Sequence, residues 1–510
     1  MEASQAAKAS LERYYKNLFK SLKEREQRRQ MYLKKMEEMG LNSEEKEKRI
    51  TQLYKIETEY TRARRVRLSS DTFKTIRIIG KGSFGEVHLV QMKGTGKLYA
   101  MKKLRKSTMI ERNQVSHVKN ERDALALLND FTQNNPWVTK LYYSFQDALY
   151  LYFIMEYVPG GDMMTQLMKL QVLTEDETRF YIAELVLAVD SVHGVSFIHR
   201  DIKPDNILID KCGHIKLTDF GLSIGLSSED KVETLRARYK DKDRYSSLKD
   251  NEKPPKREED DTEAINVTYS RPGGEPTGLS LRKTDERFSS WNAKRRVLAF
   301  SEVGTPDYMA PDVLNRESSD NAYGEEADWW SVGVIMFEML AGFPIFYSNE
   351  EDENEPSTFE KILEYPKYLE EALSEVSLSP MAEDLIRRFC SDKKVRIGRN
   401  GVEEIKSHPF FKGIDWDNIR KGDGPLIPQI SHPLDTRYFP KYDVDEIEDE
   451  QIREEMKQME EQDKDFPRWR GRRLRQNDLP FIGFTYKNFA AVPSLLSATP
   501  KKEPTSFKRY

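Results

Sequence analysis

The alternation of hydrophobic and polar residues changes at residue 73, where short runs rich in β-branched and aromatic residues begin. Such runs, separated by turn residues, are typical of β-strands. Strands are predicted over residues 73–80, 86–93, 97–104, 141–148 and 149–158, with a helix over about 114–128 between the third and the fourth. Residues 73–155 are therefore expected to form a small, β-rich lobe.

Helical periodicity takes over after the glycine pair at residues 160–161. Long apolar helices are predicted within residues 180–194 and 327–342. The pattern indicates an α+β protein with two lobes, in which residues 156–160 form a hinge and residues 161–411 form a larger, helical lobe.

Residues 1–70 have a different pattern, with many Lys, Arg and Glu residues and with apolar residues at helical spacing. One helix or two are predicted here, with a break near residues 40–43, where Asn42 or Ser43 could cap a second helix. The region closes with a cluster of arginines that has no interleaved acids, namely Arg62, Arg64, Arg65 and Arg67. A solvated helix explains most of these charges, but the arginine cluster is a candidate binding surface.

Two further segments interrupt the two-lobe pattern. Residues 227–294 are rich in Lys, Asp, Glu, Pro and Ser and poor in aliphatic residues, which is typical of a flexible insertion. Residues 412–490 form a polar tail with little periodicity that ends in an apolar string at 481–489. Residues 491–510 are expected to be a disordered end.

Composition narrows the class of protein. The net charge of −4 gives no overall attraction to nucleic acid or membrane, and no apolar run approaches the roughly 18 residues needed to span a bilayer. The two cysteines, Cys212 and Cys390, argue against a disulfide scaffold, and the seven scattered histidines suggest no zinc site. Since the start of the chain also lacks a signal-peptide core, a cytoplasmic protein is expected, with the nucleus as a further possible location.

The first chemical motif is GKGSFGEV, at residues 80–87 between the first two predicted strands. Glycines at this spacing let backbone N–H groups approach phosphates closely. The motif alone is weak because dinucleotide folds share it, but a strand rather than a helix follows it, which argues against a Rossmann fold. On the third strand, Lys102 could bridge two phosphates, with Glu121 of the following helix as its natural partner.

The motifs HRDIKPDN and DFG, which follow in the helical part of the chain, decide the chemistry. In phosphoryl transfer, catalysis is mostly positioning and charge stabilisation. Asp201 would orient a substrate hydroxyl and accept its proton, and Lys203 would stabilise charge on the transferred phosphoryl group. Asn206 and Asp219 supply hard oxygen ligands of the kind that Mg²⁺ prefers. A salt-bridged structural loop does not explain all four residues beside a matching glycine loop.

With these motifs, residues 73–411 resemble the eukaryotic protein kinase superfamily. The resemblance implies the two-lobed kinase fold, with ATP bound between the lobes and Mg²⁺ as cofactor. It assigns the following residues to ATP binding: Gly80, Lys81, Gly82, Ser83, Phe84, Gly85, Val87, Ala100, Lys102, Glu121, Met155, Glu156, Val158 and Asp162. Met155 would be the gatekeeper before the hinge, and Asp328 would anchor the catalytic-loop backbone. The GTPDY motif together with Lys203 resembles serine/threonine rather than tyrosine kinases.

One motif departs from the family pattern. The usual APE appears as APD, so that Asp312 replaces the glutamate that pairs with a large-lobe arginine, here Arg396. Because aspartate is one methylene shorter, the pair is expected to be longer or shifted, with a modest effect on stability and no loss of activity.

In detail the chain resembles the NDR/LATS branch of the AGC kinases, on the NDR side. The motifs that carry this resemblance are EYVPGGDMM, HRDIKPDN, AFSEVGTPDYMAP, the long insertion after DFG and the terminal FIGFTYKNF. The N-terminal stretches LKEREQRRQ, EEMGLNSEEK and ETEYTRARRVRLS resemble the Mob-binding region of this family. A LATS-type kinase is the alternative, but the AFS and TPDY motifs and the short N-terminal arm favour the NDR side.

The resemblance also implies two phosphorylation sites. Ser301, in the activation segment, resembles an autophosphorylation site whose phosphate could order the loop against nearby basic residues. Thr485 resembles a hydrophobic-motif site that an upstream kinase phosphorylates. Its apolar neighbours are Phe481, Phe484 and Tyr486, which suit a groove on the small lobe beside the helix of Glu121. An ordinary core strand is the less favoured interpretation of this string.

Partners are inferred in the same way. The N-terminal arginine cluster would bind an acidic Mob-type coactivator; a nucleic-acid role is the rival, but the cluster lacks interleaved aromatic residues. Acids at Asp162, Asp205 and Glu338 would favour protein substrates with Arg or Lys before the target Ser or Thr. The basic end of the insertion, at residues 294–296, is either autoinhibitory, as the family suggests, or a plain disordered spacer.

A pseudokinase scaffold, which binds partners without catalysis, is the rival from another class of protein. It predicts that at least one catalytic residue is replaced by another type, but the sequence keeps Lys102, Asp201, Asn206 and Asp219. An active serine/threonine protein kinase is therefore the predicted function.

Overall fold

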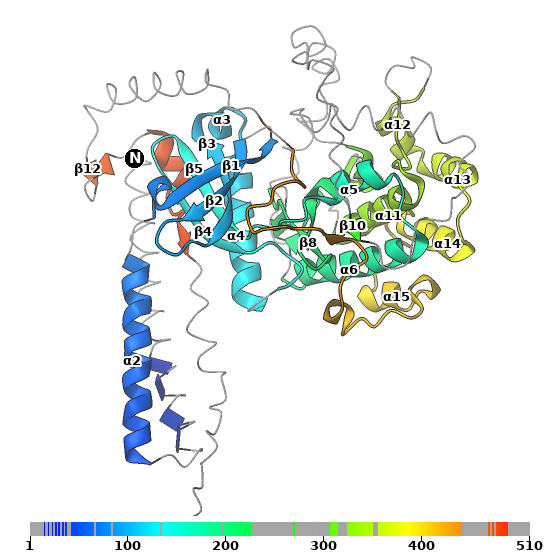
Figure 1. Ribbon diagram of the computed structural model, residues 1–510. Coiled ribbons are helices and arrows are strands. Elements are labelled where there is room, and N and C mark those ends of the chain that lie inside the picture. The colour runs from blue at the N-terminus through cyan, green and yellow to red at the C-terminus, as the bar shows by residue number, and fades with distance from the viewer. Residues whose placement is uncertain are drawn as a thin grey trace, which may run out of the picture.

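The computed structural model describes most of the chain between residues 42 and 487 and single residues before it (Figure 1). The described residues are 15, 19, 23, 26–27, 29–30, 33–34, 36–37, 42–65, 68–82, 85–132, 135–195, 197–221, 223–225, 269–270, 291, 306–314, 324–349, 355–440, 442, 468–469, 472–473 and 476–487. Within these ranges no helix is long and apolar enough to cross a membrane.

The small lobe is built on an antiparallel sheet with the strand order β1-β2-β3-β5-β4-β14. Its strands are β1 (Phe73–Gly82), β2 (Gly85–Met92), β3 (Leu98–Arg105), β4 (Leu141–Gln146), β5 (Tyr150–Met155) and β14 (Tyr486–Lys487). The first five confirm the strands predicted from the alternating pattern. The sixth comes from the far end of the chain and pairs with the edge of β4, where Tyr486 lies opposite Ser144.

Both faces of this sheet are covered by apolar side chains. Successive residues of a strand point to opposite faces, so Phe153 of β5 joins the main core, with Leu125 and Leu128 of helix α4 (Val115–Thr132). Its neighbours Tyr152 and Ile154 belong to a second, smaller cluster on the other face. The helix expected near residues 114–128 is thus confirmed, and the short helix α3 (Lys106–Glu111) before it was not predicted.

The large lobe is mainly helical. Its helices are α5 (Met163–Leu170), α6 (Glu175–His193), α10 (Pro311–Leu314), α11 (Glu326–Ala341), α12 (Thr358–Leu363), α13 (Tyr365–Glu375), α14 (Pro380–Phe389) and α15 (Val402–Lys406). Every residue of α11 from Ala327 to Ala341 is buried, as expected for a helix that is apolar on all sides. It packs against α6 and α14 in the centre of the lobe. Gly333 permits this approach, because a Cβ there would lie 2.5 Å from Phe389 Cβ.

Short strands and 3₁₀ turns complete the described part of the chain. The strands form antiparallel pairs, namely β6 (Phe197–Ile198) with β9 (Ile224–Gly225), β7 (Ile207–Ile209) with β8 (Ile215–Leu217), β10 (Tyr269–Ser270) with β11 (Ile427–Pro428), and β12 (Arg468–Trp469) with β13 (Arg472–Arg473). The 3₁₀ turns are η1 (Ser70–Thr72), η2 (Pro204–Asn206), η5 (Pro306–Tyr308), η6 (Pro409–Phe411), η7 (Ile419–Lys421) and η9 (Gln476–Phe481).

Before the kinase-like lobes, helix α2 (Ser43–Arg65) extends away from the small lobe (Figure 1). Asn42 caps it, because its Oδ1 accepts a hydrogen bond from Glu45 N at 2.8 Å. The predicted second N-terminal helix and its cap are therefore confirmed.

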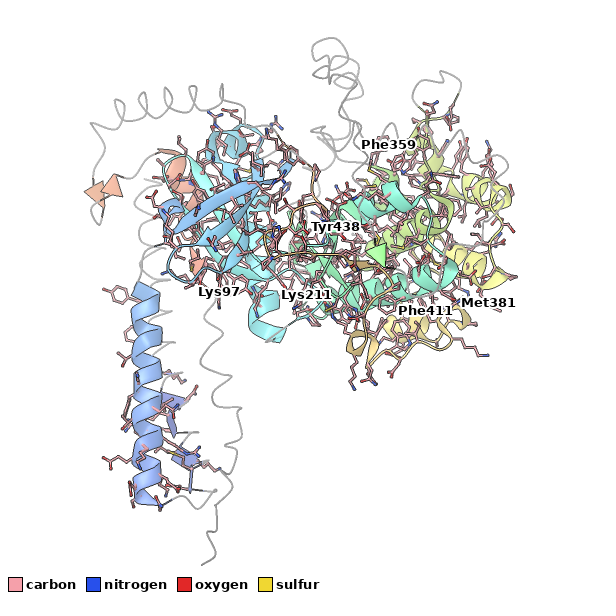
Figure 2. The ribbon with its side chains drawn as sticks, viewed as in Figure 1. Lys97, Lys211, Phe359, Met381, Phe411 and Tyr438 are labelled. Atoms are coloured by element: carbon pink, nitrogen blue, oxygen red, sulfur yellow. The ribbon has the colours of Figure 1, made fainter. Side chains whose placement is uncertain are left out.

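The C-terminal tail packs against both lobes, and Figure 2 shows Tyr438 between them. At the hinge, the Tyr157 hydroxyl donates to Asp435 O at 3.0 Å, and the Tyr157 ring stacks on Phe439 with centroids 5.8 Å apart. Gly161 lies directly beneath the tail, since a Cβ there would approach Tyr438 O to 2.6 Å. The tail thus holds the hinge from outside, which its weak periodicity did not predict.

Candidate active site

The catalytic loop is held from below by a buried carboxylate at the start of α11. Asp328 Oδ2 accepts a hydrogen bond from His199 N at 2.9 Å, and Asp328 Oδ1 accepts one from Arg200 N at 2.8 Å. Burial raises the pKa of Asp328, but the hydrogen bond to His193 and other contacts outweigh it, so the pKa lies below its usual value. Arg200 has a φ of 68°, a strained conformation that this anchoring compensates. The role of anchor expected for Asp328 is confirmed.

The loop then brings the predicted catalytic residues together. Lys203 Nζ lies 3.1 Å from Asp201 Oδ2. The Asn206 amide nitrogen donates to Asp201 O at 2.8 Å and to Asp201 Oδ2 at 3.0 Å. Burial lowers the pKa of Lys203, but the carboxylates of Asp201 and Asp205 raise it by more. The pKa is therefore above its usual value, and the ammonium stays charged. The side chain of Asp201 is thereby fixed from two sides.

A second cluster joins the small lobe to the DFG segment. Lys102 Nζ of β3 lies 2.8 Å from Glu121 Oε1 of α4 and 3.2 Å from Asp219 Oδ1. Burial raises the pKa of Asp219, but the charges of Lys102 and Lys203 lower it by more, so that the pKa is about 2. Burial lowers the pKa of Lys102, whereas Asp219 and Glu121 raise it above its usual value. The partner predicted for Lys102 is therefore confirmed, and helix α4 lies close enough to reach it.

The glycine motif lies where β1 ends and β2 begins. Gly80, Lys81 and Gly82 lie on β1, and Gly82 is paired with Gly85 of β2. A Cβ at Gly85 would lie 1.9 Å from Lys103 O, so this position requires glycine. The turn residues Ser83 and Phe84 lie outside the described residues.

The predicted ATP-binding residues of β2, β3 and β5 lie opposite one another in the strand pairing. Val87 is paired with Lys102, and Ala100 with the predicted gatekeeper Met155. Met155 and Val158 are buried, with exposed fractions of 6% and 3%. These predicted ATP-binding residues therefore come from neighbouring strands and the hinge.

Asp162 lies just after the hinge and caps helix α5. Its Oδ1 accepts from Thr165 N at 2.6 Å, and its Oδ2 accepts from Thr165 Oγ1 at 2.9 Å. Burial and the charge of Asp205 raise the pKa of Asp162 to about 6. Two carboxylates that repel each other at the edge of the site are suited to a cationic ligand group.

The Asp312–Arg396 pair is neither longer nor shifted, contrary to expectation. Arg396 Nη1 lies 2.8 Å from Asp312 Oδ2, and Nη2 lies 3.2 Å from Oδ1. The geometry is bidentate, which is the strong form of this ion pair.

The tail string at 481–487 docks on the small lobe. Phe481 and Phe484 are buried, and the Phe484 ring packs edge-on against Phe153 with centroids 5.2 Å apart. Ser144 Oγ donates to Phe484 O at 2.6 Å, and Gln146 donates to Phe481 O at 2.9 Å. The predicted docking is present, and it includes a short strand, β14, that the sequence favoured less.

Two more contacts fix the tail, and neither residue was predicted to take part. Lys106 of α3 forms an ion pair with Asp478 and also donates to Asp147 O at 2.7 Å. Arg122, next to Glu121 on α4, donates to Gly483 O. A single Lys or Arg in the sequence gives no signal of such a distant partner.

The insertion is attached to the large lobe at Trp291, which is fully buried. Its Nε1 donates to Glu338 Oε1 at 3.1 Å, and the Tyr308 hydroxyl donates to Glu338 Oε2 at 2.6 Å. The Trp291 ring lies edge-on to Tyr347 with centroids 5.0 Å apart. The expectation that Glu338 faces a substrate is therefore not met in this structure, where the carboxylate is buried and already bonded.

The remaining predicted residues are placed as follows. Thr485 is exposed between Phe484 and β14. Arg62, Arg64 and Arg65 lie in the last turn of α2, of whose side chains nothing is described. Arg67 and Ser301 lie outside the described residues.

Comparison with known proteins agrees with this geometry. The protein kinase domain family matches residues 73–240 and 289–411. The probable serine/threonine-protein kinase ndrB of Dictyostelium discoideum is 51% identical over 496 residues, which are 96% of this chain and 83% of that protein. The serine/threonine-protein kinases CBK1 of Candida albicans and Saccharomyces cerevisiae are 44% and 42% identical, over 94% and 95% of this chain. The chain spans about three fifths of those two proteins, with 62% and 61% covered.

These matches define the class of protein. The chain belongs to the protein kinase family and, within it, to the NDR/LATS-like serine/threonine kinases of the AGC group. It is therefore an enzyme that acts on protein substrates, and the family implies the use of ATP.

Proposed function

We propose that the chain transfers the γ-phosphate of Mg·ATP to Ser or Thr, with Asp201 orienting the substrate hydroxyl and accepting its proton. The observation that carries this proposal is the fixed position of Asp201 between Lys203 and Asn206. Lys203 is charged and lies beside the carboxylate, where it can stabilise negative charge on the transferred group. Lys102, held by Glu121, would bind the α- and β-phosphates.

The residues at the junction of the lobes fit a magnesium ion bound with nucleotide. Asp219 is ionised, since its pKa is about 2. Both hydrogen bonds from the Asn206 side chain to Asp201 use the amide nitrogen, so the amide oxygen is the atom that can bind the ion. Among the described residues no three His, Cys, Asp or Glu side chains form a metal cluster. Magnesium typically takes one or two protein carboxylates and completes its shell with phosphate and water. When bound, the ion would neutralise phosphate charge, while Asp219 and Asn206 hold it.

We infer that the preferred substrates carry basic residues before the target Ser or Thr. Burial and, after it, the negative charge of Asp205 raise the pKa of Asp162, and an Arg or Lys of the substrate would favour the ionised form of both carboxylates. Glu338 is a third candidate acid, but Trp291 occupies it here. We propose that this contact acts together with the basic residues 294–296, which lie outside the described residues, in an autoinhibitory insertion; a plain spacer is the alternative.

The regulatory inputs are proposed from the docked tail and from the family. Phosphorylation of Thr485 by an upstream kinase would add charge next to a segment that is already anchored by Phe484. Phosphorylation of Ser301 would act on the activation segment. The arginines at the end of α2 would bind an acidic Mob-type coactivator, an interaction supported by charge and by the family alone.

A single assay tests the chemistry. Phosphate transfer from Mg·ATP to a serine peptide with upstream arginines is measured for the parent, Asp201→Asn and Thr485→Ala, each with and without a Mob-type protein. The proposal expects transfer by the parent, loss in Asp201→Asn of at least about a thousandfold, and weakened activation in Thr485→Ala. If the parent binds ATP but transfers nothing after Thr485 phosphorylation, a scaffold function replaces this one.

The insertion has its own test. Trp291→Ala should lower the KM for a basic peptide, because Glu338 loses a competing donor. Trp291→Phe keeps the packing on Tyr347 but lacks the N–H group, so it separates the hydrogen bond from the packing. Equal peptide KM values for all three proteins would favour the plain spacer.

A further inference from the structure

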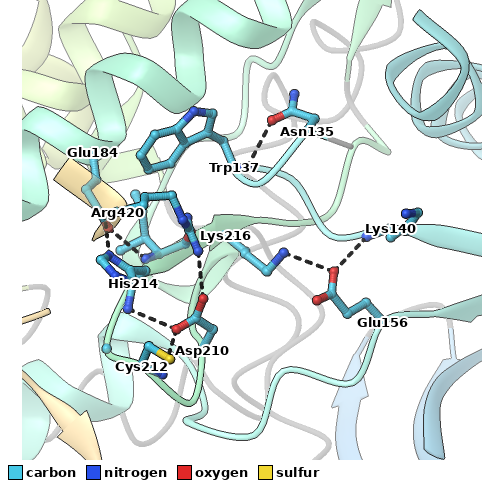
Figure 3. Close-up of polar contacts among 12 residues, drawn as sticks. Asn135, Trp137, Lys140, Glu156, Glu184, Asp210, Cys212, His214, Lys216 and Arg420 are labelled. Atoms are coloured by element: carbon cyan, nitrogen blue, oxygen red, sulfur yellow. Dashed lines mark hydrogen bonds and ion pairs between the residues drawn. The ribbon is translucent and has the colours of Figure 1, made fainter. Parts of the chain in front are cut away.

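The hinge residue Glu156 is tied to both lobes (Figure 3). Its backbone N–H donates to Lys140 O at 2.8 Å, and its Oε2 accepts from Lys140 N at 3.4 Å. The same oxygen lies 3.1 Å from Lys216 Nζ. Lys140 leads into β4 of the small lobe, whereas Lys216 is the middle residue of β8 in the large lobe. One carboxylate therefore connects the hinge with both lobes.

The position of Lys216 follows from strand geometry. Ile215 and Leu217 are fully buried in the large-lobe core, and alternation along β8 turns Lys216 to the opposite face. The Lys216 side chain is only 11% exposed, and that of Glu156 is 29% exposed. A charge so largely removed from water requires a counter-charge, and Glu156 supplies it. Packing alone gives no reason for a lysine at this place.

Strand β8 is a rigid base for this lysine. Residues 137–139 run beside it, since Val138 bridges Leu217 in parallel and Thr139 N donates to Leu217 O at 2.9 Å. Leu217 N in turn donates to Trp137 O at 2.7 Å. The Lys216 ammonium is therefore attached to a strand that is fixed next to the hinge.

The turn before β8 is fixed as well, as Figure 3 shows. Both ring nitrogens of His214 face oxygen atoms, with Glu184 Oε1 and Gly422 O each at 2.7 Å. Arg420 of the tail lies 2.6 Å from Asp210 Oδ2. These contacts hold the β7–β8 hairpin between α6 and the tail, so that little motion of Lys216 is expected.

We propose that Lys216 is a positioning residue for ATP, which acts by holding Glu156 so that the hinge backbone keeps one orientation toward the adenine. This inference rests on the proposed function and on the ATP-binding role that the family resemblance assigns to Glu156 and Val158, which we take to be contacts with the adenine base. The adenine is far from the bond that breaks, so its hinge contacts are equal in the ground state and the transition state. Loss of such uniform binding raises KM and leaves kcat unchanged.

The test compares Lys216→Met with Lys211→Met in the full chain. Lys211 is exposed in the turn between β7 and β8, so its replacement removes the same charge from the same hairpin. Lys216→Met should raise the KM for ATP and the Kd for Mg·ATP by about 3- to 10-fold, the size expected for one partly buried ion pair. The kcat and the peptide KM should stay within about twofold. Lys216→Arg keeps the charge and should stay close to the parent.

The outcomes separate the two proposals. The Kd for Mg·ATP, measured by calorimetry, needs no phosphate transfer, so a parent that binds ATP without transferring phosphate refutes the proposed function only. An unchanged Kd in Lys216→Met overturns the positioning role, even if the variant melts at a lower temperature. A higher kcat with unchanged Kd also overturns it, since the pair would then restrain lobe motion. An equal loss of affinity in Lys211→Met would point to general electrostatics and would likewise refute the inference.

Discussion

Replacement of Asp312 by asparagine tests the buried ion pair that departs from the family motif. Asparagine keeps the shape of the side chain but removes the charge opposite Arg396, whose side chain is fully buried. The guanidinium also donates to Glu326 O at 2.9 Å and to Ser391 O at 2.9 and 3.1 Å, and it lies 5.1 Å from the Trp330 ring centroid. It therefore cannot turn toward water without breaking several contacts at once.

The magnitude follows from what the arginine retains. Removing one partner of a buried ion pair typically costs about 3–5 kcal/mol, because the other charge stays buried without compensation. In Asp312→Asn the amide oxygen can still accept one hydrogen bond, and the carbonyl contacts of Arg396 persist. We therefore expect a loss of about 3 kcal/mol in the free energy of unfolding of the large lobe.

The chain offers a matched control on its surface. Arg387 and Glu370 also form a bidentate pair, through Nε and Nη2 at 2.8 and 3.0 Å, but their side chains are 39% and 59% exposed. Arg387 keeps a second carboxylate partner, because its Nη1 donates to Glu383 Oε2 at 3.0 Å. Glu370→Gln is expected to cost less than about 1 kcal/mol, because exposed ion pairs contribute little and are screened by salt. The contrast compares a buried with an exposed bidentate pair.

Urea unfolding followed by tryptophan fluorescence measures both variants, at low and at high salt. The kinase activity of Asp312→Asn below its unfolding transition should remain near that of the parent, because Asp328 and not Asp312 anchors the catalytic loop. If Asp312→Asn and Glu370→Gln cost the same, burial does not decide the strength of this pair.

Two further outcomes are expected. Phe484→Ala should free the docked tail, because it removes a buried ring that packs on Phe153, and limited proteolysis near residue 484 should become at least tenfold faster, given about 3–5 kcal/mol for such a truncation. Burial lowers the pKa of His214, but the hydrogen bond to Glu184 raises it by more, so that the pKa lies above 6.5. The protonated His214 therefore stabilises the folded protein fully below pH 6.5, and this contribution is lost as the pH rises through the raised pKa. The urea midpoint of the parent should therefore fall more steeply above pH 6.5 than that of His214→Gln, whereas a variant of the exposed His432 should follow the parent.

The sequence predicted those parts of the site that local patterns encode. The strands follow from alternation, and the contacts of Asp201, Lys203 and Asn206 follow because a few residues of one loop carry them. Lys102 and Glu121 are only nineteen positions apart, on a strand and the next long helix. In such cases the backbone path between two residues is short, and the fold leaves few arrangements.

Contacts between distant segments were not predictable in this way. Lys106 and Asp478 are 372 positions apart, and no periodicity relates them. Trp291 stands in a polar insertion, where composition indicates flexibility, yet its ring is fully buried. The Asp312–Arg396 distance was misjudged because side-chain length is visible in a sequence and the separation of the two backbones is not.

The nucleotide side of the active site and its proposed substrate side differ in the contacts that are already formed. On the nucleotide side, Glu121 pairs with Lys102 while its neighbour Arg122 holds the docked tail, so one helix, α4, serves both contacts. Any coupling between the two contacts is reciprocal, so docking of the tail would stabilise the ion pair by as much as the ion pair stabilises docking. On the substrate side, Glu338 is already bonded to Trp291. If Glu338 binds a basic residue of the substrate, as proposed, Trp291 must first be released from it.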